Sequence, residues 1–443
     1  MKLPDAFICR TKVLLGDEYL AFEKSLEENA PTSIRLNDKM HYLASDEKVS
    51  WCENGFYLKE RPLFTADPLF HAGIYYVQEA ASMFLYQAVK QHFAEARSVL
   101  DLCAAPGGKS TLLTQALSEN SLLVSNEIIR SRAYILAENL IKWGNPNIVV
   151  TNNDPKDFES LPGFFDAVIV DAPCSGEGMF RKDEGAIKEW SEYNVIMCAQ
   201  RQREILTSVW DTLKTDGKLV YSTCTYNREE NEENVRWICD ELGAELLTID
   251  LNGINNITVS DYGYRFYPHK TRGEGFFLSV LRKTSSLTRR LKIKNDNRKT
   301  GKQFNYLNLN SLKLIEPESW IINNENNIIS AYNSERFEDF ILIQKYLKCM
   351  HSGIQLGEIK GNDFIPGSSI ALSKKLNRES IECVDVDYRT AISFLKKEAI
   401  QLPQTSRGYL LITYKEQALG WVKNVGNRCN NLYPQEWRIR MKI

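Results

Sequence analysis

The chain has 443 residues, of which 43% are hydrophobic and 25% charged, a composition typical of globular proteins. Its formal net charge of −2 excludes a globally basic nucleic-acid coat protein, so any contact with nucleic acid must come from local patches. The length exceeds one hydrophobic core and indicates about three domains. Neither an apolar leader nor a run of roughly 18 apolar residues occurs, which predicts a cytoplasmic protein without a membrane segment.

Residues 1–72 have the pattern of a small α+β lobe. Apolar residues at helical spacing predict a helix over 17–29, with Tyr19, Leu20, Phe22 and Leu26 on one face. Short strands are predicted at 33–36 and 55–58. Such a lobe suits either substrate docking or a structural cap, and its residues alone do not choose between the two.

Residues 73–283 alternate between strands and helices. The predicted helices cover 78–94, a segment starting near Ser110, and a segment through Ala133 and Leu140. The predicted strands are 98–103, 122–124, 148–150, 167–170 and 217–221, followed by an antiparallel edge strand at 275–282. This alternation predicts an α/β fold, a Rossmann-like doubly wound sheet with helices on both faces.

Residues 284–350 are expected to form a basic linker and a small connecting domain. The stretch 283–302 carries eight cations against one acid, Asp296, and suits either a solvated linker or a flexible basic strap against phosphates. These cations are Lys283, Arg289, Arg290, Lys292, Lys294, Arg298, Lys299 and Lys302. A helix is predicted over 333–350.

Residues 351–443 are expected to form a small β-rich module. Its predicted strands are 353–359, 369–372, 408–414 and 418–422, separated by glycine turns. Cations (Lys415, Lys423, Arg428, Arg438, Arg440) lie beside aromatic residues (Tyr414, Trp421, Tyr433, Trp437). Aromatic residues interleaved with cations suit stacking on unpaired bases, although half of these rings are expected in the core.

A glycine-rich turn follows the strand at 98–103. It comprises Cys103, Ala104, Ala105, Pro106, Gly107, Gly108 and Lys109. Glu127 follows twenty residues after Gly107, which is the spacing of a dinucleotide-type site in which the acid accepts ribose hydroxyls. Asp154 and Asp171 end the next two strands and extend this set of acids.

A nucleotide-triphosphate loop is the alternative interpretation of the same turn. Gly107-Gly108-Lys109-Ser110 resembles the end of a Walker A loop, and residues 167–171 resemble a Walker B strand. However, the Walker spacing requires glycine where the chain has Cys103, and Pro106 cannot donate an N–H to a phosphate.

Two of the ten cysteines follow strands directly at the expected crevice, namely Cys174 and Cys224. The others are expected to be small buried residues, because without a CxxC pair the pattern predicts neither a metal site nor a disulfide framework. A thiolate at a substrate crevice suits covalent activation of a carbon atom. Carbon 5 of cytosine needs such help, because thiolate addition at carbon 6 makes carbon 5 nucleophilic.

Three segments in order resemble the RNA cytosine-5 methyltransferases of the Nop/Sun type: 100–109, Asp171-Ala172-Pro173-Cys174-Ser175-Gly176 and Tyr221-Ser222-Thr223-Cys224-Thr225. Residues 73–79 and 265–269 also match that family, and the resemblance covers roughly 1–283. Residues 351–358, 420–423 and 432–434 are similar to the PUA-like tail of the bacterial RsmF-like branch, which modifies 16S ribosomal RNA. The resemblance implies an RNA-docking role for residues 1–72 and a PUA-like RNA-binding domain at 351–443.

The resemblance also implies the cofactor and the site residues. S-adenosylmethionine would be bound by residues 103–109 together with Glu127, Asp154 and Asp171. Cys224 would be the nucleophile and Cys174 would assist release of the methylated base, with Asp171 beside the base. DNA cytosine methyltransferases use their Pro-Cys thiol for attack, so residue chemistry alone leaves the two thiol roles open. The expected partner is 16S ribosomal RNA or the small ribosomal subunit, and the expected state is a monomer.

Two further functions are consistent with the residues. One is a P-loop-type ATPase, which calorimetry with ATP and S-adenosylmethionine would distinguish. The other is a non-catalytic ribosome-assembly factor that binds RNA. The presence of Cys174, Cys224 and Asp171 argues against this second function, because a protein without chemistry has no need for all three.

Overall fold

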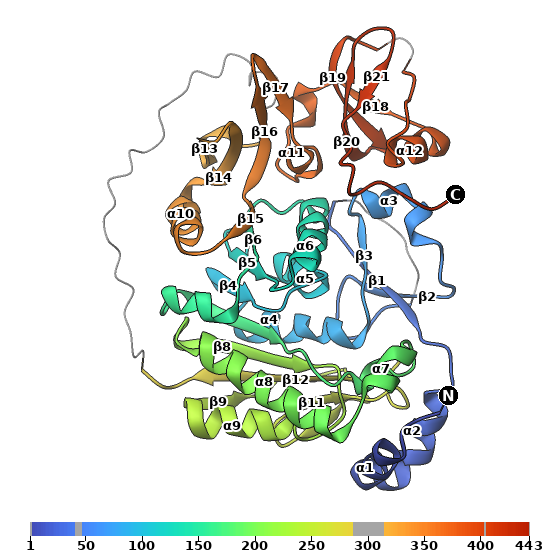
Figure 1. Ribbon diagram of the computed structural model, residues 1–443, viewed down its shortest axis with the longest axis vertical. Helices are drawn as coiled ribbons and strands as arrows, with labels where there is room; N and C mark the ends of the chain where they lie inside the picture. Colours follow the sequence, from blue (N-terminus) through green and yellow to red (C-terminus); the bar gives the residue numbers. More distant parts are fainter. Residues whose placement is uncertain (1, 40–46, 287–313, 403–404, 443) are drawn as a thin grey trace.

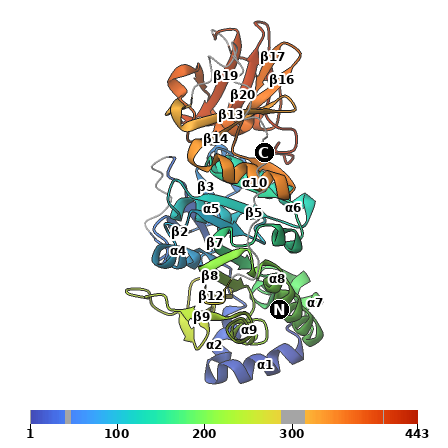
Figure 2. The ribbon, with the colours of Figure 1, turned by 90° about the vertical axis from the view of Figure 1, so that its left-hand side faces the viewer.

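The computed structural model describes residues 2–39, 47–286, 314–402 and 405–442. The elements are stacked in tiers along the longest axis, with the C-terminal residues at one end and the N-terminal helices at the other (Figures 1 and 2). Between them lies a large sheet with helices on both sides, so the predicted α/β fold is confirmed.

In the described part of the chain, ten strands form the central sheet. Nine of them have the order β10-β11-β12-β8-β7-β4-β5-β6-β15, and β9 also pairs with β12. The parallel strands are β4 (Ser98–Asp101), β5 (Leu122–Asn126), β6 (Ile148–Thr151), β7 (Phe165–Asp171) and β8 (Leu213–Thr223). Because β4 lies between β5 and β7, the strand order reverses there, and the carboxyl ends of β4 and β7 border the crevice where ligands bind in such sheets.

Alternating residues of the parallel strands enter two separate cores, one on each face of the sheet. Val99 and Ile169 pack on one face with helices α4, α5 and α6, whereas Leu100 and Val168 pack on the other with α8, α9 and α10. These helices are α4 (Leu85–His92), α5 (Gly108–Ala116), α6 (Arg130–Trp143), α8 (Glu192–Trp210), α9 (Glu232–Leu242) and α10 (Phe337–Tyr346). The double coverage explains why the strands are continuous apolar runs.

The sheet continues beyond the predicted edge strand. Strand β12 (Phe276–Lys283) is antiparallel to β8 as expected, but it is not an edge, because β11 (Gly263–Phe266) and β9 (Ala244–Leu247) both pair with it. Strand β10 (Thr258–Ser260) extends that side. At the other side β15 (Cys349–Ser352) pairs antiparallel with β6, so a strand from the predicted connecting domain belongs to the central sheet and crosses residue 350.

The N-terminal residues divide into two parts. Strands β1 (Thr32–Leu36), β2 (Gly55–Leu58) and β3 (Tyr75–Val77) form a small sheet, with α3 (Pro68–His71) nearby. The predicted helix over 17–29 is a 3₁₀ turn followed by α2 (Tyr19–Ser25), and the preceding α1 (Asp5–Leu15) was not predicted. Tyr19 and Phe22 are buried as expected, but Leu20 is 73% exposed.

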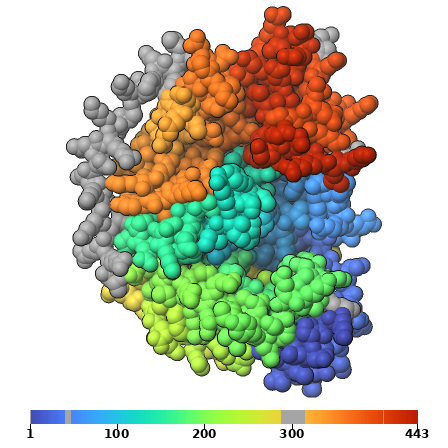
Figure 3. Space-filling model, viewed as in Figure 1, coloured from blue at the N-terminus to red at the C-terminus, as the bar shows by residue number. Residues whose placement is uncertain are grey.

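Two four-stranded sheets form the C-terminal end, with orders β13-β14-β16-β17 and β18-β19-β20-β21. Their strands are β13 (Trp320–Glu325), β14 (Ile328–Asn333), β16 (Ile354–Lys360), β17 (Asp363–Pro366), β18 (Cys383–Asp385), β19 (Gly408–Tyr414), β20 (Gln417–Asn424) and β21 (Cys429–Asn431). In the space-filling view these residues cover the upper part of the molecule (Figure 3).

Two local predictions were wrong. Residues 369–372 belong to a helix, α11 (Ser368–Leu372), whose small and apolar residues are buried between β16 and β20. The predicted helix over 78–94 starts late, with a 3₁₀ turn over Ala81–Phe84 before α4. Glu79 lies before this turn, and its carboxylate accepts from the backbone N–H of Ser82. The remaining helices are α7 (Glu184–Glu189) and α12 (Tyr388–Leu395).

Candidate active site

The two candidate catalytic thiols lie in contact. Strands β7 and β8 are parallel neighbours, with Asp171 paired to Ser222, so the segments that follow them leave the sheet side by side. The Sγ atoms of Cys174 and Cys224 are 3.3 Å apart. The hydrogen bond with Cys224, together with burial, raises the pKa of Cys174 well above its usual range. Cys174 therefore remains a thiol at neutral pH.

Asp171 lies between the turn at 103–109 and the two thiols. Its Oδ2 is 2.8 Å from Nζ of Lys109, and its Oδ1 accepts a hydrogen bond from Ser222 Oγ at 2.8 Å. Burial alone would lower the pKa of Lys109, but the charge and hydrogen bond of Asp171 outweigh it, and the pKa is raised. Lys109 therefore stays protonated in this ion pair, and the Asp171 oxygens retain acceptor capacity for a ligand.

The glycine turn connects β4 to helix α5. Gly107 directly precedes the first helical residue and has φ +115°. Only glycine adopts this backbone conformation readily. The turn is fixed from α6, where Asn139 donates to the carbonyl of Pro106 at 2.8 Å and Arg132 donates to that of Ala105 at 2.9 Å. Burial raises the pKa of Cys103, so this thiol serves as an apolar residue of the turn.

Glu127 and Asp154 follow β5 and β6 and have different surroundings. Glu127 is buried, accepts from the Ile129 N–H at 2.9 Å, and lies 3.6 Å from Arg132. Asp154 is exposed and caps a 3₁₀ turn by accepting from the Lys156 N–H at 3.0 Å. Asn126 joins the strand ends, because it donates to the carbonyls of Leu102 and Asn153.

A further acid, Asp101, was part of the recognised segment but was not predicted as a site residue. Its side chain is fully buried at the end of β4; Oδ2 accepts from Ser110 Oγ at 2.6 Å, while Oδ1 has no partner among the described residues. Burial raises the pKa of Asp101 to about 7. The sequence feature that could have identified Asp101 as a site residue is its place at the end of a strand, directly before the glycine turn.

These residues fit S-adenosylmethionine. Four strand ends present carboxyl groups, and the buried Oδ1 of Asp101 retains an unused acceptor position. Acceptor groups suit ribose hydroxyls and the cationic ammonium and sulfonium of this cofactor, whereas a triphosphate requires donors. The only cation of the turn, Lys109, is already paired with Asp171.

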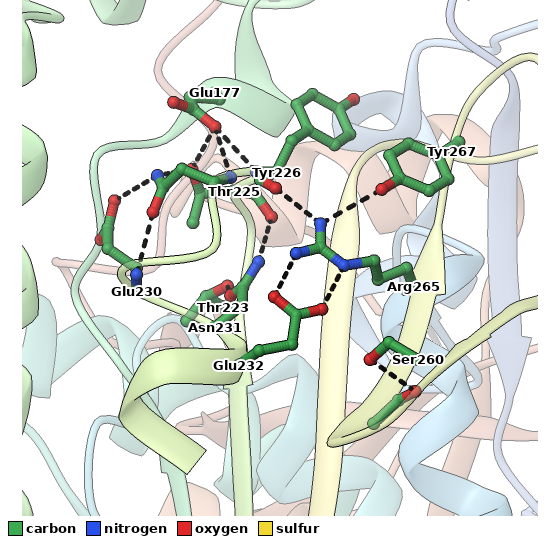
Figure 4. Close-up of polar contacts among 12 residues, drawn as sticks. Glu177, Thr223, Thr225, Tyr226, Glu230, Asn231, Glu232, Ser260, Arg265 and Tyr267 are labelled. Carbon is green, nitrogen blue, oxygen red and sulfur yellow. Dashed lines mark hydrogen bonds and ion pairs between the residues drawn. The ribbon is translucent and has the colours of Figure 1, made fainter. Parts of the chain in front are cut away.

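Two buried glutamates beside the thiols were also missed. Glu177 and Glu230 accept hydrogen bonds across the two cysteine-bearing segments. Figure 4 shows the contacts of Glu177 with Thr225 and Tyr226, together with the buried Arg265–Glu232 pair. Their spacing from Cys174 and Cys224 carries no signal in one sequence, because a glutamate in a polar loop is normally solvated.

The predicted RNA-binding cations differ in their surroundings. Lys283 is fully buried and donates to the carbonyl of Trp210 at 2.8 Å, so it belongs to the core and not to a strap. The other seven cations of that stretch lie outside the described residues. Trp421 and Tyr433 are core residues, while Tyr414 and Trp437 are partly buried, in line with the expectation that half of these rings are structural.

Within the described residues, no group of three or more His, Cys, Asp or Glu side chains is placed to hold a metal ion. In the same part of the chain, no helix combines the length and the apolar character needed to cross a membrane. The described cysteines form no disulfide.

Three family models match the chain. They are 16S rRNA methyltransferase RsmB/F over 89–282, the N-terminal domain of 16S rRNA methyltransferase RsmF over 3–80, and the methyltransferase RsmF PUA domain over 382–439. Among solved structures, a methyltransferase homologue from Pyrococcus horikoshii is 26% identical with a TM-score of 0.55, covering 63% of this chain and 95% of that one. NSun6 from the same organism, at 21% identity and TM-score 0.54 over 64% and 99% of the chains, shares the fold.

Full-length relatives match over almost their whole length. Ribosomal RNA small subunit methyltransferase F of Vibrio vulnificus (strain YJ016) is 30% identical, covering 98% of this chain and 97% of the relative. The protein of the same name from Escherichia coli O157:H7 (strain EC4115) is also 30% identical, over 98% and 96%. With the Rossmann-like sheet, the paired thiols and the three matching models, the chain belongs to the ribosomal RNA small subunit methyltransferase F family.

Proposed function

We propose that this chain transfers a methyl group from S-adenosylmethionine to carbon 5 of a cytosine in 16S ribosomal RNA through a covalent adduct with Cys224. The observation that carries this mechanism is the 3.3 Å contact between the thiols of Cys174 and Cys224 at the ends of adjacent strands. Family membership supports an RNA methyltransferase and decides against the P-loop ATPase.

The cofactor would be held by residues 103–109 with Glu127, Asp154 and Asp171. When bound there, it supplies an electrophilic methyl group. Asp171 connects this turn to the thiols, because its carboxylate pairs with Lys109 and lies beside Ser222 of the strand that leads to Cys224. The target cytosine must be unpaired or unstacked to reach this crevice.

Cys224 attacks carbon 6 of the cytosine as its thiolate, forming a C–S bond and moving electron density to carbon 5. After carbon 5 takes the methyl group, a base removes its proton and the electron pair re-forms the ring double bond. The C–S bond then breaks and its electrons return to Cys224. The protonated thiol of Cys174, 3.3 Å from that sulfur, stabilises the returning charge by donating its S–H.

The first test replaces the proposed nucleophile. Cys224→Ala should reduce methyl transfer by more than roughly 10³-fold, because no adduct can form. Its affinity for S-adenosylmethionine, measured by calorimetry, should equal that of the wild type, because the turn is untouched. Retained turnover in Cys224→Ala would refute the assignment. Bisulfite sequencing of 16S ribosomal RNA with and without the protein would identify the modified cytosine.

The second test concerns Cys174. Cys174→Ala should form the adduct with RNA but resolve it slowly, so a covalent protein–RNA species should persist on a denaturing gel. Complete turnover without a trapped species would show that Cys174 is structural. A protein that binds RNA but forms no adduct and transfers no methyl group, even in its wild-type form, would instead be a ribosome-assembly factor.

The surrounding domains are proposed to serve the same reaction. Residues 1–72 would dock RNA, residues 73–283 would carry out methyl transfer, residues 284–350 would connect the domains, and residues 351–443 would bind RNA as a PUA-like module. We further propose that the protein acts as a monomer in the cytoplasm on ribosomal RNA or the small subunit.

A further inference from the structure

Two buried carboxylates connect the thiol-bearing segments in opposite directions. We call residues 172–180 the Cys174 loop and residues 224–231 the Cys224 loop. Glu177 lies in the Cys174 loop and Glu230 in the Cys224 loop, with exposed fractions of 2% and 0%. Each carboxylate accepts hydrogen bonds from the other loop, as Figure 4 shows for Glu177 with Thr225 and Tyr226.

Glu177 binds the residues that directly follow Cys224. Its Oε2 accepts from Thr225 Oγ1 at 2.8 Å, from the Tyr226 N–H at 2.8 Å and from the Asn227 N–H at 2.9 Å. Its Oε1 accepts from Trp190 Nε1 at 2.9 Å. One carboxylate therefore fixes the main chain next to the proposed nucleophile.

Glu230 binds the residue that directly follows Cys174. Its Oε2 accepts from the Ser175 N–H at 3.0 Å and from Gln202 Nε2 at 2.7 Å. Its Oε1 accepts from Asn227 Nδ2 at 2.8 Å. Gln202 also donates to the carbonyl of Pro173, so both peptide groups around Cys174 are held.

Neither carboxylate has a cationic nitrogen within 4.0 Å among the described residues, as the ion pairs of this part of the chain show. Burying an uncompensated carboxylate is costly unless several hydrogen bonds satisfy it. Neutral donors satisfy both groups here, and most of them belong to the two thiol-bearing loops. The loops also approach closely at Gly178, where an added Cβ would lie 2.8 Å from the carbonyl oxygen of Cys224.

We propose that Glu177 and Glu230 are positioning residues with separate duties: Glu177 holds Cys224 for attack, and Glu230 holds Cys174 for release. The proposal rests on the roles assigned to the two thiols under "Proposed function". It follows from the direction of the contacts, because each glutamate binds backbone beside the thiol of the opposite loop. Loss of either one should therefore slow a different step of the same reaction.

The experiment compares Glu177→Gln, Glu230→Gln and the control Glu233→Gln in single-turnover reactions with RNA and S-adenosylmethionine. Each glutamine directs an amide N–H₂ at groups that themselves donate. We expect Glu177→Gln to slow adduct formation by about 100-fold without accumulation of adduct, as displacement of a reacting group does. We expect Glu230→Gln to form the adduct at nearly the wild-type rate and to retain it on a denaturing gel. Glu233 is exposed on α9, and its variant should behave as wild type.

Calorimetric affinity for S-adenosylmethionine should be unchanged in all three variants. Equal slowing of both steps in both variants, or loss of cofactor binding, would overturn the separate duties. Glu177→Asp and Glu230→Asp retain a carboxyl group and should each regain part of the affected step. Identical defects in Asp and Gln variants would also overturn the proposal. Absence of trapping in Glu230→Gln refutes the role of Glu230 if Cys174→Ala does trap, whereas absence in both refutes the proposed role of Cys174 itself.

Discussion

The ion pair between Lys109 and Asp171 gives the lysine of the glycine turn a role other than phosphate binding. In a P-loop the lysine extends toward the β- and γ-phosphates. Here Nζ of Lys109 lies 2.8 Å from the Asp171 carboxylate, and both belong to the sheet crevice. The lysine thus pairs with a strand-end acid that lies between the glycine turn and the thiols, which is consistent with methyl transfer rather than ATP hydrolysis.

At the same scale, Asp101 should make the stability of the apoprotein depend on pH. Burial raises its pKa to about 7, so the folded state holds a proton that the unfolded state releases near pH 4. The free energy of unfolding should therefore fall as pH rises between these values. The fall ends near the folded pKa of about 7, so between pH 5 and 8 only about two pH units contribute, which at 1.36 kcal/mol per unit amounts to about 3 kcal/mol.

Asp101→Asn should remove this pH dependence, since an amide does not titrate. Urea unfolding of wild type and variant at pH 5 and pH 8 measures it, with the exposed Asp261→Asn as control. On going from pH 5 to pH 8, the free energy of unfolding of the wild type should fall by about 3 kcal/mol more than that of the variant. Parallel stability curves for wild type and Asp101→Asn would show that Asp101 is ionised in the folded apoprotein.

At the scale of elements, one arginine joins strand β1 to helix α5. The guanidinium of Arg35 is fully buried, donates to Gln78, Gln115 and Thr111, and lies 4.5 Å from the Trp143 ring. Burial lowers the pKa of Arg35 to about 10. The small N-terminal sheet is therefore fixed to the helix that begins at the glycine turn, and displacement of β1 would disturb that turn.

Arg35→Met should destabilise the protein by about 3 kcal/mol, because the buried acceptor of Gln78 and the half-buried acceptor of Gln115 would lose their donor. Arg35→Lys should lose less, since its ammonium retains some of these bonds. Denaturant unfolding measures both, and Arg61→Met, an exposed change in the same lobe, serves as control. A loss below about 1 kcal/mol, the usual range for surface sites, would exclude the proposed linkage.

The parallel strands could be predicted because each is a short apolar run that ends in a polar residue at the crevice. The helix over 368–372 could not, because a short buried segment such as Ile370-Ala371-Leu372 is equally apolar in a strand. Helix α1 was missed because its residues Asp5 to Leu15 have little amphipathic pattern. The sequence did not predict that β12 lies inside the sheet, because its neighbours β9 and β11 are only four residues long and carry little strand signal.

The candidate site could be located from strand-end residues, since parallel strands bring their carboxyl ends to one edge. The contact between Cys174 and Cys224 follows from the pairing of β7 with β8, which the sequence implied only through the fold. Glu177 and Glu230 could not be predicted, because their role depends on which backbone N–H groups face them across two loops.

At the scale of the whole molecule, the two ends of the chain share a hydrophobic core. Ile34 and Tyr75 of the N-terminal sheet pack in the same cluster as Phe394, Leu410 and other residues of the C-terminal module. Strand β15 also joins the central sheet, so the connecting segment is held at a second place. The C-terminal module is thus fixed relative to the candidate active site, and RNA bound to the module would reach that site at a defined distance.

This arrangement predicts that exposed cations of the C-terminal module contribute salt-sensitive RNA affinity. Lys415, Arg428, Arg438 and Arg440 are exposed there. Replacing all four by Gln should weaken binding and reduce the slope of log affinity against log salt by about 0.7 for each phosphate of single-stranded RNA that the protein no longer neutralises. Filter binding at several salt concentrations measures the slope.

Lys90→Gln, an exposed change on α4 far from the module in sequence, is the control. An unchanged slope in the fourfold variant would mean that RNA binds the catalytic domain and N-terminal lobe without this surface, because a protein that neutralises fewer phosphates must release fewer counterions.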